Sequence, residues 1–378
     1  MTKISDSSIR LTKLQKLILC SMILLFFLFS SYHYLYVVTS TFQSNSLRIE
    51  HTSTINAKIH IITVSDDEAQ RRYQQHSNTL FCYAHRHGYH FTSINPHHYY
   101  ACSVIENYYF KKHCAVIQYL IQNPNVQWLV VLDGDTFVVN ATKTIDAFLP
   151  IDPDIHVVHY ERFMDNEIMA GNYIIRNHPW SLFYLNEWVE YFKKIPSVGH
   201  HNHDNGAIHL HFLNMTNMVD RQTFDKCAIL YNQSHDEGLY MKYVACTKCA
   251  LRGKRKFTHM ILHRRGQSFC RDNGLPPYKI HQLDLMFHGF KQDLTHFFQQ
   301  SIDTSTCINE TNWTPILRSS LVLSDIESAK LLMRDFEKHA MDKFHTTVAY
   351  PEITNCWPNC DTDITAEALT DYMNALCN

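Results

Sequence analysis

The sequence lacks any strong excess of charge of one sign. Its 378 residues contain 34 Lys and Arg against 36 Asp and Glu, which gives a formal net charge of −2 at pH 7. Proteins that bind nucleic acid usually present an excess of basic residues to the phosphate backbone. The balance therefore argues against a nucleic-acid partner. The chain also lacks an internal repeat, and its length accommodates one large domain or two.

Charged residues are absent from one long stretch near the N-terminus. Residues 17–38 read LILCSMILLFFLFSSYHYLYVV, and four basic residues precede them in the segment 1–16. Such a stretch is long enough to cross a bilayer as a helix. The positive-inside rule then puts the N-terminus in the cytosol and the rest of the chain in the lumen. A cleaved signal peptide is the alternative, but its apolar region is usually shorter. We expect an uncleaved anchor followed by a polar stem at 39–57.

Cysteine usage fits a lumenal body. Eleven of the twelve cysteines follow the apolar stretch, and an oxidising lumen predicts at least two disulfides, including Cys356 or Cys360. Cys246 and Cys249 lack a second pair, so a disulfide is favoured over a zinc knuckle, and the short His clusters form no closed zinc ligand set. Five candidate N-glycosylation sequons support the secretory route weakly; they begin at Asn140, Asn214, Asn232, Asn309 and Asn312.

The first part of the body alternates strands and helices. Strand patterns at 58–67, 89–95 and 128–132 are separated by helical patterns at 68–88 and 108–125, which stop at Gly88 and before Pro124. This alternation predicts a parallel sheet with helices on both faces. Later segments are less regular, and the expected elements are strands within 154–161 and 283–293, a strand and helix in 171–192, and helices from 201–213 and 324–344.

The stretch WLVVLDGDTFVVN (128–140) holds two carboxylates at the end of an apolar run. Asp-Gly between β-branched residues is typical of a hairpin turn. In an open α/β sheet, however, ligands bind beyond the carboxyl ends of the strands. Asp133 and Asp135 lie at such an end, after two strand–helix units. Carboxylates spaced in this way can share a hard divalent cation, and that cation can bridge the oxygens of a diphosphate.

These features together resemble the Golgi glycosyltransferases of the GT-A fold. The similarity is greatest to glycosyltransferase family 34, whose members transfer galactose, mannose or xylose, and closer still to an uncharacterised nematode family, domain of unknown function 273. It runs from about Lys58 to Asp293 and includes the stretches FCYAHRHGYHF, GNYIIRNHPWSL, HDNGAI and FHGFK. The resemblance implies a GT-A (Rossmann-like) α/β domain at 58–297, with a mixed, mainly parallel sheet. Residues 298–378 lie outside it and are expected to form a helical, Cys-containing extension.

The resemblance also implies roles for individual residues. Asp133, Gly134 and Asp135 match the motif that holds manganese, or magnesium, and the sugar nucleotide. His288 matches a third metal ligand. Further matches place Thr63 and Val64 at the nucleotide base and Lys291 near the diphosphate. Lys112 matches a family lysine early in the helix before the acidic pair and is expected to help bind the nucleotide sugar. A lone His in an apolar strand is more often a core histidine; Gly289 and Lys291, together with the resemblance, favour a ligand role for His288. Taken alone, Lys112 and Lys291 are most often solvated surface charges.

The resemblance is incomplete on the side of the reacting sugar. Relatives often carry Asp-Asp-Gln-Ser where this chain has His203-Asp204-Asn205-Gly206. Asp204 and Asn205 are the candidate catalytic residues, and Asp204 could alternatively serve as a helix N-cap. A further departure is Met169-Ala170-Gly171-Asn172, where relatives have Asn-Thr-Gly-Ser.

The sequence thus predicts a single-pass type II membrane enzyme of the Golgi or ER. It would move a sugar from a UDP- or GDP-linked donor to a glycan acceptor, with retention of anomeric configuration implied by the resemblance. The alternative is a lumenal binding or scaffold protein that kept the fold and lost catalysis. A metal-dependent hydrolase is a third reading, for which no motif is present.

Overall fold

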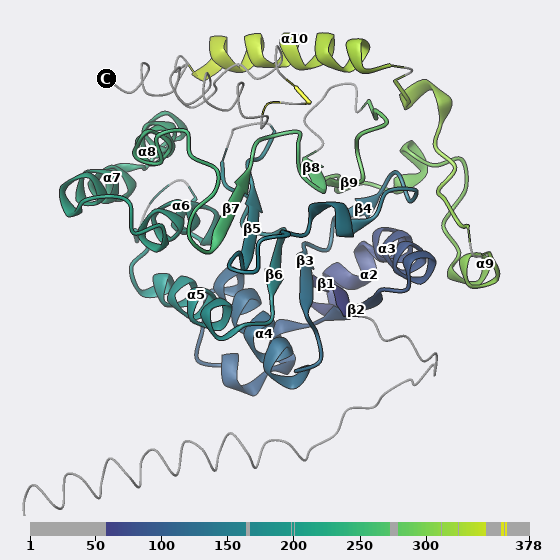
Figure 1. The fold of residues 1–378 in the computed structure, drawn as a ribbon, viewed down its shortest axis with the longest axis horizontal. Coiled ribbons are helices and arrows are strands. Elements are labelled where there is room, and N and C mark those ends of the chain that lie inside the picture. Colours follow the sequence, from purple (N-terminus) through teal and green to yellow (C-terminus); the bar gives the residue numbers. More distant parts are fainter. Residues whose placement is uncertain are drawn as a thin grey trace, which may run out of the picture. The chain divides into compact units, whose positions relative to one another are not determined.

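A six-stranded sheet forms the centre of the structure, a computed structural model (Figure 1). The structure describes residues 58–163, 167–197, 199, 201–272, 279–310, 312–323, 325–344, 357, 358 and 360. The strands, in spatial order, are β2 (His90–Ile94), β1 (Ile59–Val64), β3 (Trp128–Leu132), β6 (Tyr173–Arg176), β5 (Val157–Tyr160) and β7 (Met260–His263).

The sheet is mixed and mainly parallel, as predicted. Strand β1 is parallel to β2 and β3, and β5 is parallel to β7. Strand β6 is antiparallel to both of its neighbours, β3 and β5. The carboxyl ends of β1, β2 and β3 therefore meet at one edge of the sheet.

The helices between the first strands follow the predicted segments, except that the segment 68–88 is divided into two helices at Tyr73. They are α2 (Asp67–Arg72), α3 (Gln74–His87) and α4 (Tyr108–Gln122). Helix α3 stops at Gly88, whose φ of 70° is the left-handed conformation that glycine adopts at helix ends. Helix α4 starts at Asn107, whose side chain accepts a hydrogen bond from the backbone N–H of Tyr109. It ends before Pro124, because the residue preceding a proline disfavours helical backbone.

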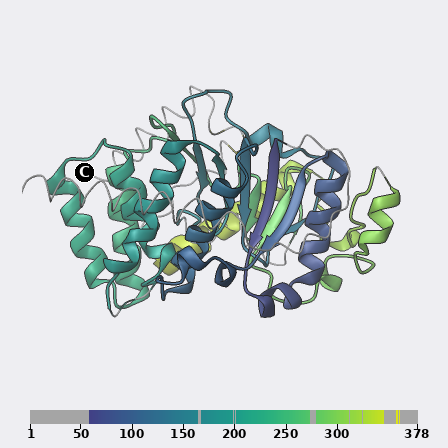
Figure 2. The same ribbon diagram turned by 90° about the horizontal axis from the view of Figure 1, so that it is seen from below.

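Both faces of the sheet are buried. Leu129 and Val131 of β3 point into a core shared with α4, whereas Val130 and Leu132 point into a second core shared with α3. Figure 2 shows the strands between two groups of helices, with α5 to α8 on one side and α3 on the other. Burial on both faces explains why β3 is apolar at every position.

A second, three-stranded sheet lies beside the first. Its order is β4 (Phe137–Val138), β9 (Met286–His288) and β8 (Cys270–Asp272), with β4 antiparallel to β9 and β9 parallel to β8. Strand β4 follows β3 closely in sequence, so the chain passes from one sheet to the other at residues 133–136. The segment 128–140 is therefore not a hairpin.

The region between β6 and β7 is helical. It contains α5 (Pro179–Glu190), α6 (Asp204–Met215), α7 (Arg221–Gln233) and α8 (Glu237–Ala250). The sequence patterns predicted α5 and α6 but not α7 or α8. A disulfide between Cys227 and Cys246 joins these last two helices. Cys246 and Cys249 are both disulfide-bonded, as expected in place of a zinc knuckle.

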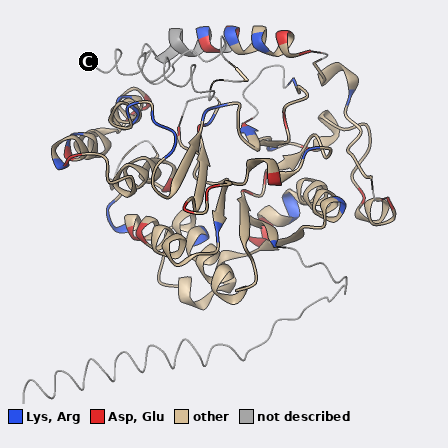
Figure 3. Ribbon diagram, in the orientation of Figure 1, with Lys and Arg blue, Asp and Glu red and all other residues tan. Residues whose placement is uncertain are grey.

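The segment after residue 298 packs onto the sheet domain. It contains α9 (Thr304–Asn309) and α10 (Ile326–Phe344), and charges of both signs follow one another along α10 (Figure 3). A disulfide from Cys307 to Cys82 ties α9 to α3, and a buried ion pair joins Glu337 of α10 to Arg265 at 2.5 Å. Cys360 is also disulfide-bonded. The predictions of disulfides and of a helix in this extension are confirmed.

Two sequence predictions concern the secretory route. The anchor predicted at residues 17–38 lies outside the described residues. Within the described part of the chain, no helix is long and apolar enough to cross a membrane. Of the sequon asparagines, Asn140 is half-buried and hydrogen-bonds the carbonyl of Gln282 at 3.3 Å, while the other four are exposed: Asn214, Asn232, Asn309 and Asn312.

Candidate functional site

The turn from β3 to β4 carries the acidic pair. The backbone N–H of Thr136 donates to the carbonyl of Asp133 at 3.1 Å, which closes the turn. Asp133 is partly exposed and Asp135 is buried. Because β4 pairs with β9, the turn is brought next to His288 at the end of β9. The change of sheet thus places a residue from late in the chain beside two carboxylates from its first half.

These three side chains form a compact ligand cluster. His288 Nε2 lies 3.5 Å from Asp133 Oδ2 and 3.3 Å from Asp135 Oδ1. One ligand atom from each residue lies within 4.8 Å of the others. Two carboxylate oxygens and an imidazole nitrogen suit Mn²⁺ and are compatible with Mg²⁺. The donor set and its spacing therefore fit a divalent cation, as the sequence predicted.

His288 is oriented by a residue that the sequence analysis did not identify. In the parallel β8–β9 register, Asp272 is the partner of His288, and His288 Nδ1 lies 2.7 Å from Asp272 Oδ1. Nδ1 donates its hydrogen to Asp272, and this contact orients the ring so that Nε2 faces Asp133 and Asp135. Burial raises the pKa of Asp272, but Arg162 and His288 outweigh it and lower that pKa to about 2.

Cations of the protein itself balance the acidic cluster. Burial opposes ionisation of Asp133, yet Lys112 and His288 hold the pKa of Asp133 below its usual range. Burial also opposes protonation of His288, but Asp135 and the neighbouring carboxylates raise the pKa of His288 well above its ordinary value. A divalent cation that takes Nε2 as a ligand must therefore displace a proton from His288.

Lys112 is not a solvated surface charge. It is buried on α4, and its Nζ lies 2.5 Å from Asp133 Oδ1. Burial lowers the pKa of Lys112, but the nearby carboxylates of Asp133 and Asp204 raise it above its ordinary value. Lys112 therefore carries a fixed positive charge between the two carboxylates.

Asp204 is the first residue of α6, and its charge also acts on Lys112. It is not the N-cap, since that position belongs to His203. Asp204 Oδ1 accepts from the backbone N–H of Asn205 at 2.9 Å, and Oδ2 lies 3.2 Å from His113 Nε2. Burial raises the pKa of Asp204, but hydrogen bonds from the two histidines and the charge of Lys112 bring it well below its usual range. Asn205 is half-buried beside it.

The segment 169–172, where the chain departs from relatives, supports the acidic turn. Asn172 Oδ1 accepts from the backbone N–H of Asp133 at 2.7 Å, and Asn172 Nδ2 donates to the Tyr160 hydroxyl at 3.1 Å. Gly171 lies so close that a Cβ there would be 1.8 Å from Asp133 Oδ2. Only glycine leaves space for the carboxylate in this position.

The remaining predicted site residues differ in how far they are buried. Thr63 and Val64 are both buried, and the Thr63 hydroxyl donates a hydrogen bond to Ser93 Oγ at 2.7 Å. Neither side chain is therefore exposed to a ligand in solution. Gly134 lies against Ser65, since a Cβ at Gly134 would be 3.3 Å from that side chain. Lys291 is exposed in the loop after β9, and its charge acts on Asp135.

One family model matches a large part of this chain. A family model described as "Protein of unknown function, DUF273" matches residues 80–304, which include the acidic turn, Asp272 and His288. The chain belongs to this family. No curated protein matches it. Among solved structures, it is similar to the "crystal structure of a glycosyltransferase involved in the glycosylation of the major capsid of PBCV-1", with 12% identity and a TM-score of 0.38. That match covers 68% of this chain and 99% of the other.

Proposed function

We propose that this chain is a metal-dependent glycosyltransferase. It moves a hexose or pentose from a nucleoside diphosphate donor to a glycan acceptor, with retention of configuration. The observation that carries the proposal is the cluster of Asp133, Asp135 and His288, with one ligand atom from each lying within 4.8 Å of the others. The cluster lies where the carboxyl ends of the central strands meet, which is where α/β sheets bind their ligands.

The residues around the cluster suit a diphosphate leaving group. Asp133, Asp135 and His288 would hold Mn²⁺ or Mg²⁺, which acts as a Lewis acid on the diphosphate oxygens. Asp272 keeps Nε2 of His288 directed at the two carboxylates. Buried Lys112 brings positive charge to Asp133, and exposed Lys291 brings positive charge to Asp135. Positive charge in these positions stabilises the diphosphate as it separates from the sugar.

Asp204 and Asn205 form the side of the site that we assign to the reacting sugar. The ionised carboxylate of Asp204 is held by His113, His203 and the backbone of α6, so it is fixed rather than mobile. A fixed negative charge stabilises positive charge that develops on the sugar ring as the diphosphate departs. We assign no covalent nucleophile. Asn205 stands where relatives carry Gln, and this replacement bears on which sugar is transferred.

Calorimetric titration of the full chain with UDP and GDP, with and without Mn²⁺, tests the proposal. We expect binding that requires the metal, and we expect Asp135→Asn to weaken it at least tenfold, because a charged oxygen ligand is lost at constant size. Asp225→Asn on the exposed face of α7 is the matched control and should bind as the wild type does. Binding that ignores both the chelator and Asp135→Asn would contradict the proposal.

Turnover separates the enzyme from the inactive alternative. A panel of UDP- and GDP-sugars should yield free nucleoside diphosphate in the presence of Mn²⁺ and glycan acceptors. Metal-dependent nucleotide binding without release from any donor would instead support a lumenal binding protein that kept the fold.

We further propose that the enzyme is a type II membrane protein of the Golgi or ER, from the charge asymmetry around residues 17–38. Protease added to sealed microsomes should leave the body intact until detergent is added. Digestion of the body in sealed vesicles would place it in the cytosol instead.

A further inference from the structure

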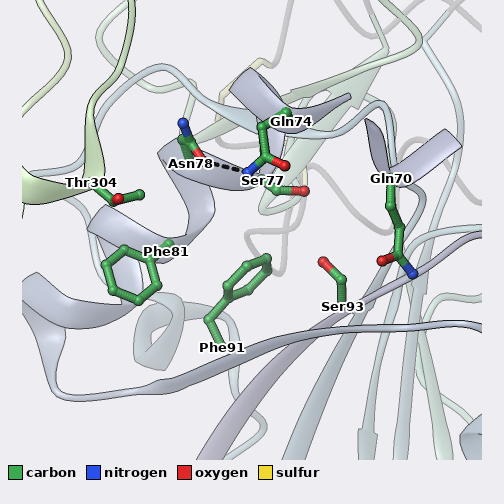
Figure 4. A pocket seen from close by; sticks show the side chains of 8 residues that line it. All are labelled: Gln70, Gln74, Ser77, Asn78, Phe81, Phe91, Ser93 and Thr304. Atoms are coloured by element: carbon green, nitrogen blue, oxygen red, sulfur yellow. Dashed lines mark hydrogen bonds between the residues drawn. The ribbon is translucent and has the colours of Figure 1, made fainter. Parts of the chain in front are cut away.

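A separate hollow lies beside the edge strand of the sheet, between α2, α3, β2 and the start of α9 (Figure 4). Its volume is about 270 Å³, and it shares no lining residue with the acidic cluster. The lining consists of amide, hydroxyl and phenyl side chains: Gln70, Gln74, Ser77, Asn78, Phe81, Phe91, Ser93 and Thr304.

The lining carries no ionisable side chain. A phosphate or a metal ion would thus lose its hydration there without gaining an opposite charge. Phe81 and Phe91 are both half-buried, and Figure 4 shows their rings lining the same hollow as Ser77 and Ser93. Such a lining favours a neutral ligand that has both apolar faces and polar edges.

Each amide group donates one hydrogen bond within the protein, and two of them keep a carbonyl oxygen for a ligand. Gln74 Nε2 donates to Asn78 Oδ1 at 2.9 Å, Asn78 Nδ2 donates to the carbonyl of Ile302 at 2.8 Å, and Gln70 Nε2 donates to the carbonyl of Ser65 at 2.8 Å. The carbonyl oxygens of Gln70 and Gln74 have no partner among the described residues. Both oxygens can accept hydrogen bonds from a ligand.

A hydroxyl group of the lining supplies a hydrogen-bond donor. Ser93 Oγ accepts from the Thr63 hydroxyl, so its own hydrogen is free to donate. A ligand that fits must therefore donate to two amide carbonyls, accept from a hydroxyl, and place an apolar face on phenyl rings. A sugar ring has hydroxyls around its edge and C–H groups on its faces. We propose that this hollow binds a neutral sugar unit of a glycan.

The C-terminal segment contributes one wall and is fixed in place. Thr304 opens α9, and the disulfide from Cys307 to Cys82 attaches that helix to α3 next to Phe81. The backbone N–H of Ile302 also donates to Gln75 Oε1 at 2.8 Å. The wall therefore does not have to close around the ligand. The ligand class follows from the lining alone, so it holds whether or not the acidic cluster transfers sugars.

Saturation-transfer NMR on the full chain tests the inference, with lactose, maltotriose, mannotriose and xylotriose as probes. We expect at least one of them to bind, and Ser77→Trp to weaken that binding at least tenfold by filling the hollow. Gln74→Ala should weaken it about fivefold through loss of one hydrogen bond. Gln222→Trp on the exposed face of α7 is the matched control and should leave binding unchanged. Melting temperatures show whether each variant is folded.

Competition distinguishes this hollow from the acidic cluster. UDP with Mn²⁺ should not displace the sugar, and Asp135→Asn should not weaken it. Absence of transfer to all four probes, binding that survives Ser77→Trp, or displacement by UDP would each overturn the inference. Displacement by uridine would assign the hollow to a nucleoside instead. The UDP titration of the same samples reports separately on the proposed transferase site.

Discussion

At the scale of single residues, the acidic turn is constrained most tightly at Gly171. This glycine lies against the carboxylate that bonds Lys112 and approaches His288. The space beside Asp133 is therefore set by a residue with no functional group of its own. Gly171 and Asn172 open the stretch GNYIIRNHPWSL, but that stretch does not reveal this role, because the contact depends on the pairing of β3 with β6.

Gly171→Ala tests this constraint. The new methyl group must displace the Asp133 carboxylate, so we expect Mn²⁺ affinity to fall at least tenfold and the free energy of unfolding to fall by about 1–3 kcal/mol. Gly238→Ala on α8 is the control, because its Cβ meets only Asp236 at 3.4 Å. Alanine is a better helix former than glycine, so the control should be neutral or slightly stabilising. Titration with Mn²⁺ and urea unfolding measure both effects.

Asp272 leads to a second residue-scale prediction. Asp272→Asn keeps the shape of the side chain but removes the charge that supports His288, and loss of such a support typically costs 10–100-fold in metal affinity. The control is Asp284→Asn, since Asp284 is also buried and paired with an arginine, Arg271, at 2.7 Å. Both variants should lose stability, but only Asp272→Asn should weaken Mn²⁺ binding. Equal metal affinity in the two variants would refute the orienting role.

At the scale of elements, the sequence predicted what local patterns determine. The β1–α3–β2–α4–β3 order follows from periodicity and from stop signals at Gly88 and Pro124. Strand β8 is only three residues long, too short to show a period, so Asp272 was not found. The buried residues of helix α8 lie on one face, but that face includes the polar residues Thr247 and Lys248, so its apolar pattern is interrupted and does not mark the helix. His288 was identified by resemblance, and its meeting with Asp135 depends on the second sheet.

The disulfide between α3 and α9 makes an element-scale prediction. Cys82 and Cys307 are 225 residues apart, whereas Cys102 and Cys114 are 12 apart. By loop-closure entropy, the long bridge contributes about 5 kcal/mol and the short one about 3 kcal/mol. Replacing Cys82 and Cys307 by alanine should therefore lower the urea midpoint more than replacing the short pair. The opposite order would show that entropy of the unfolded chain does not decide the effect.

At the scale of the whole molecule, several buried histidines affect the stability of the folded state. Burial lowers the pKa of His159 to about 3 and that of His281 to about 4, and it brings the pKa values of His209 and His211 well below the ordinary value. These groups stay neutral in the folded state, whereas in the unfolded chain they protonate near pH 6.5. His288 has the opposite sign, since its raised pKa stabilises the folded state; this contribution is complete below pH 6.5 and is lost as the pH rises toward the folded-state pKa of His288, so it adds no slope below pH 6.5.

Stability should therefore fall as the pH drops below about 6.5, with each neutral histidine contributing about 1.4 kcal/mol per pH unit until its folded-state pKa is reached. Urea unfolding at several pH values between 7.5 and 5 measures this slope. His159→Gln removes one ionisable group and should reduce the slope by about one proton. A slope that is unchanged in this variant would mean that other groups control the acid sensitivity.

Because the chain passes from β3 to β4 early and reaches β9 late, the residues of the acidic cluster are synthesised at different times. Asp133, Asp135 and Lys112 leave the ribosome together, so the lysine can neutralise one carboxylate as soon as the first strands pair. The imidazole of His288 comes much later, after the helices α5 to α8 and strand β8 that carries its orienting partner. A nascent or shortened chain that ends after β7 thus has the carboxylates but not the complete ligand set. If the proposed site binds a metal, the complete ligand set exists only after the second sheet has formed, so binding would follow the formation of that sheet.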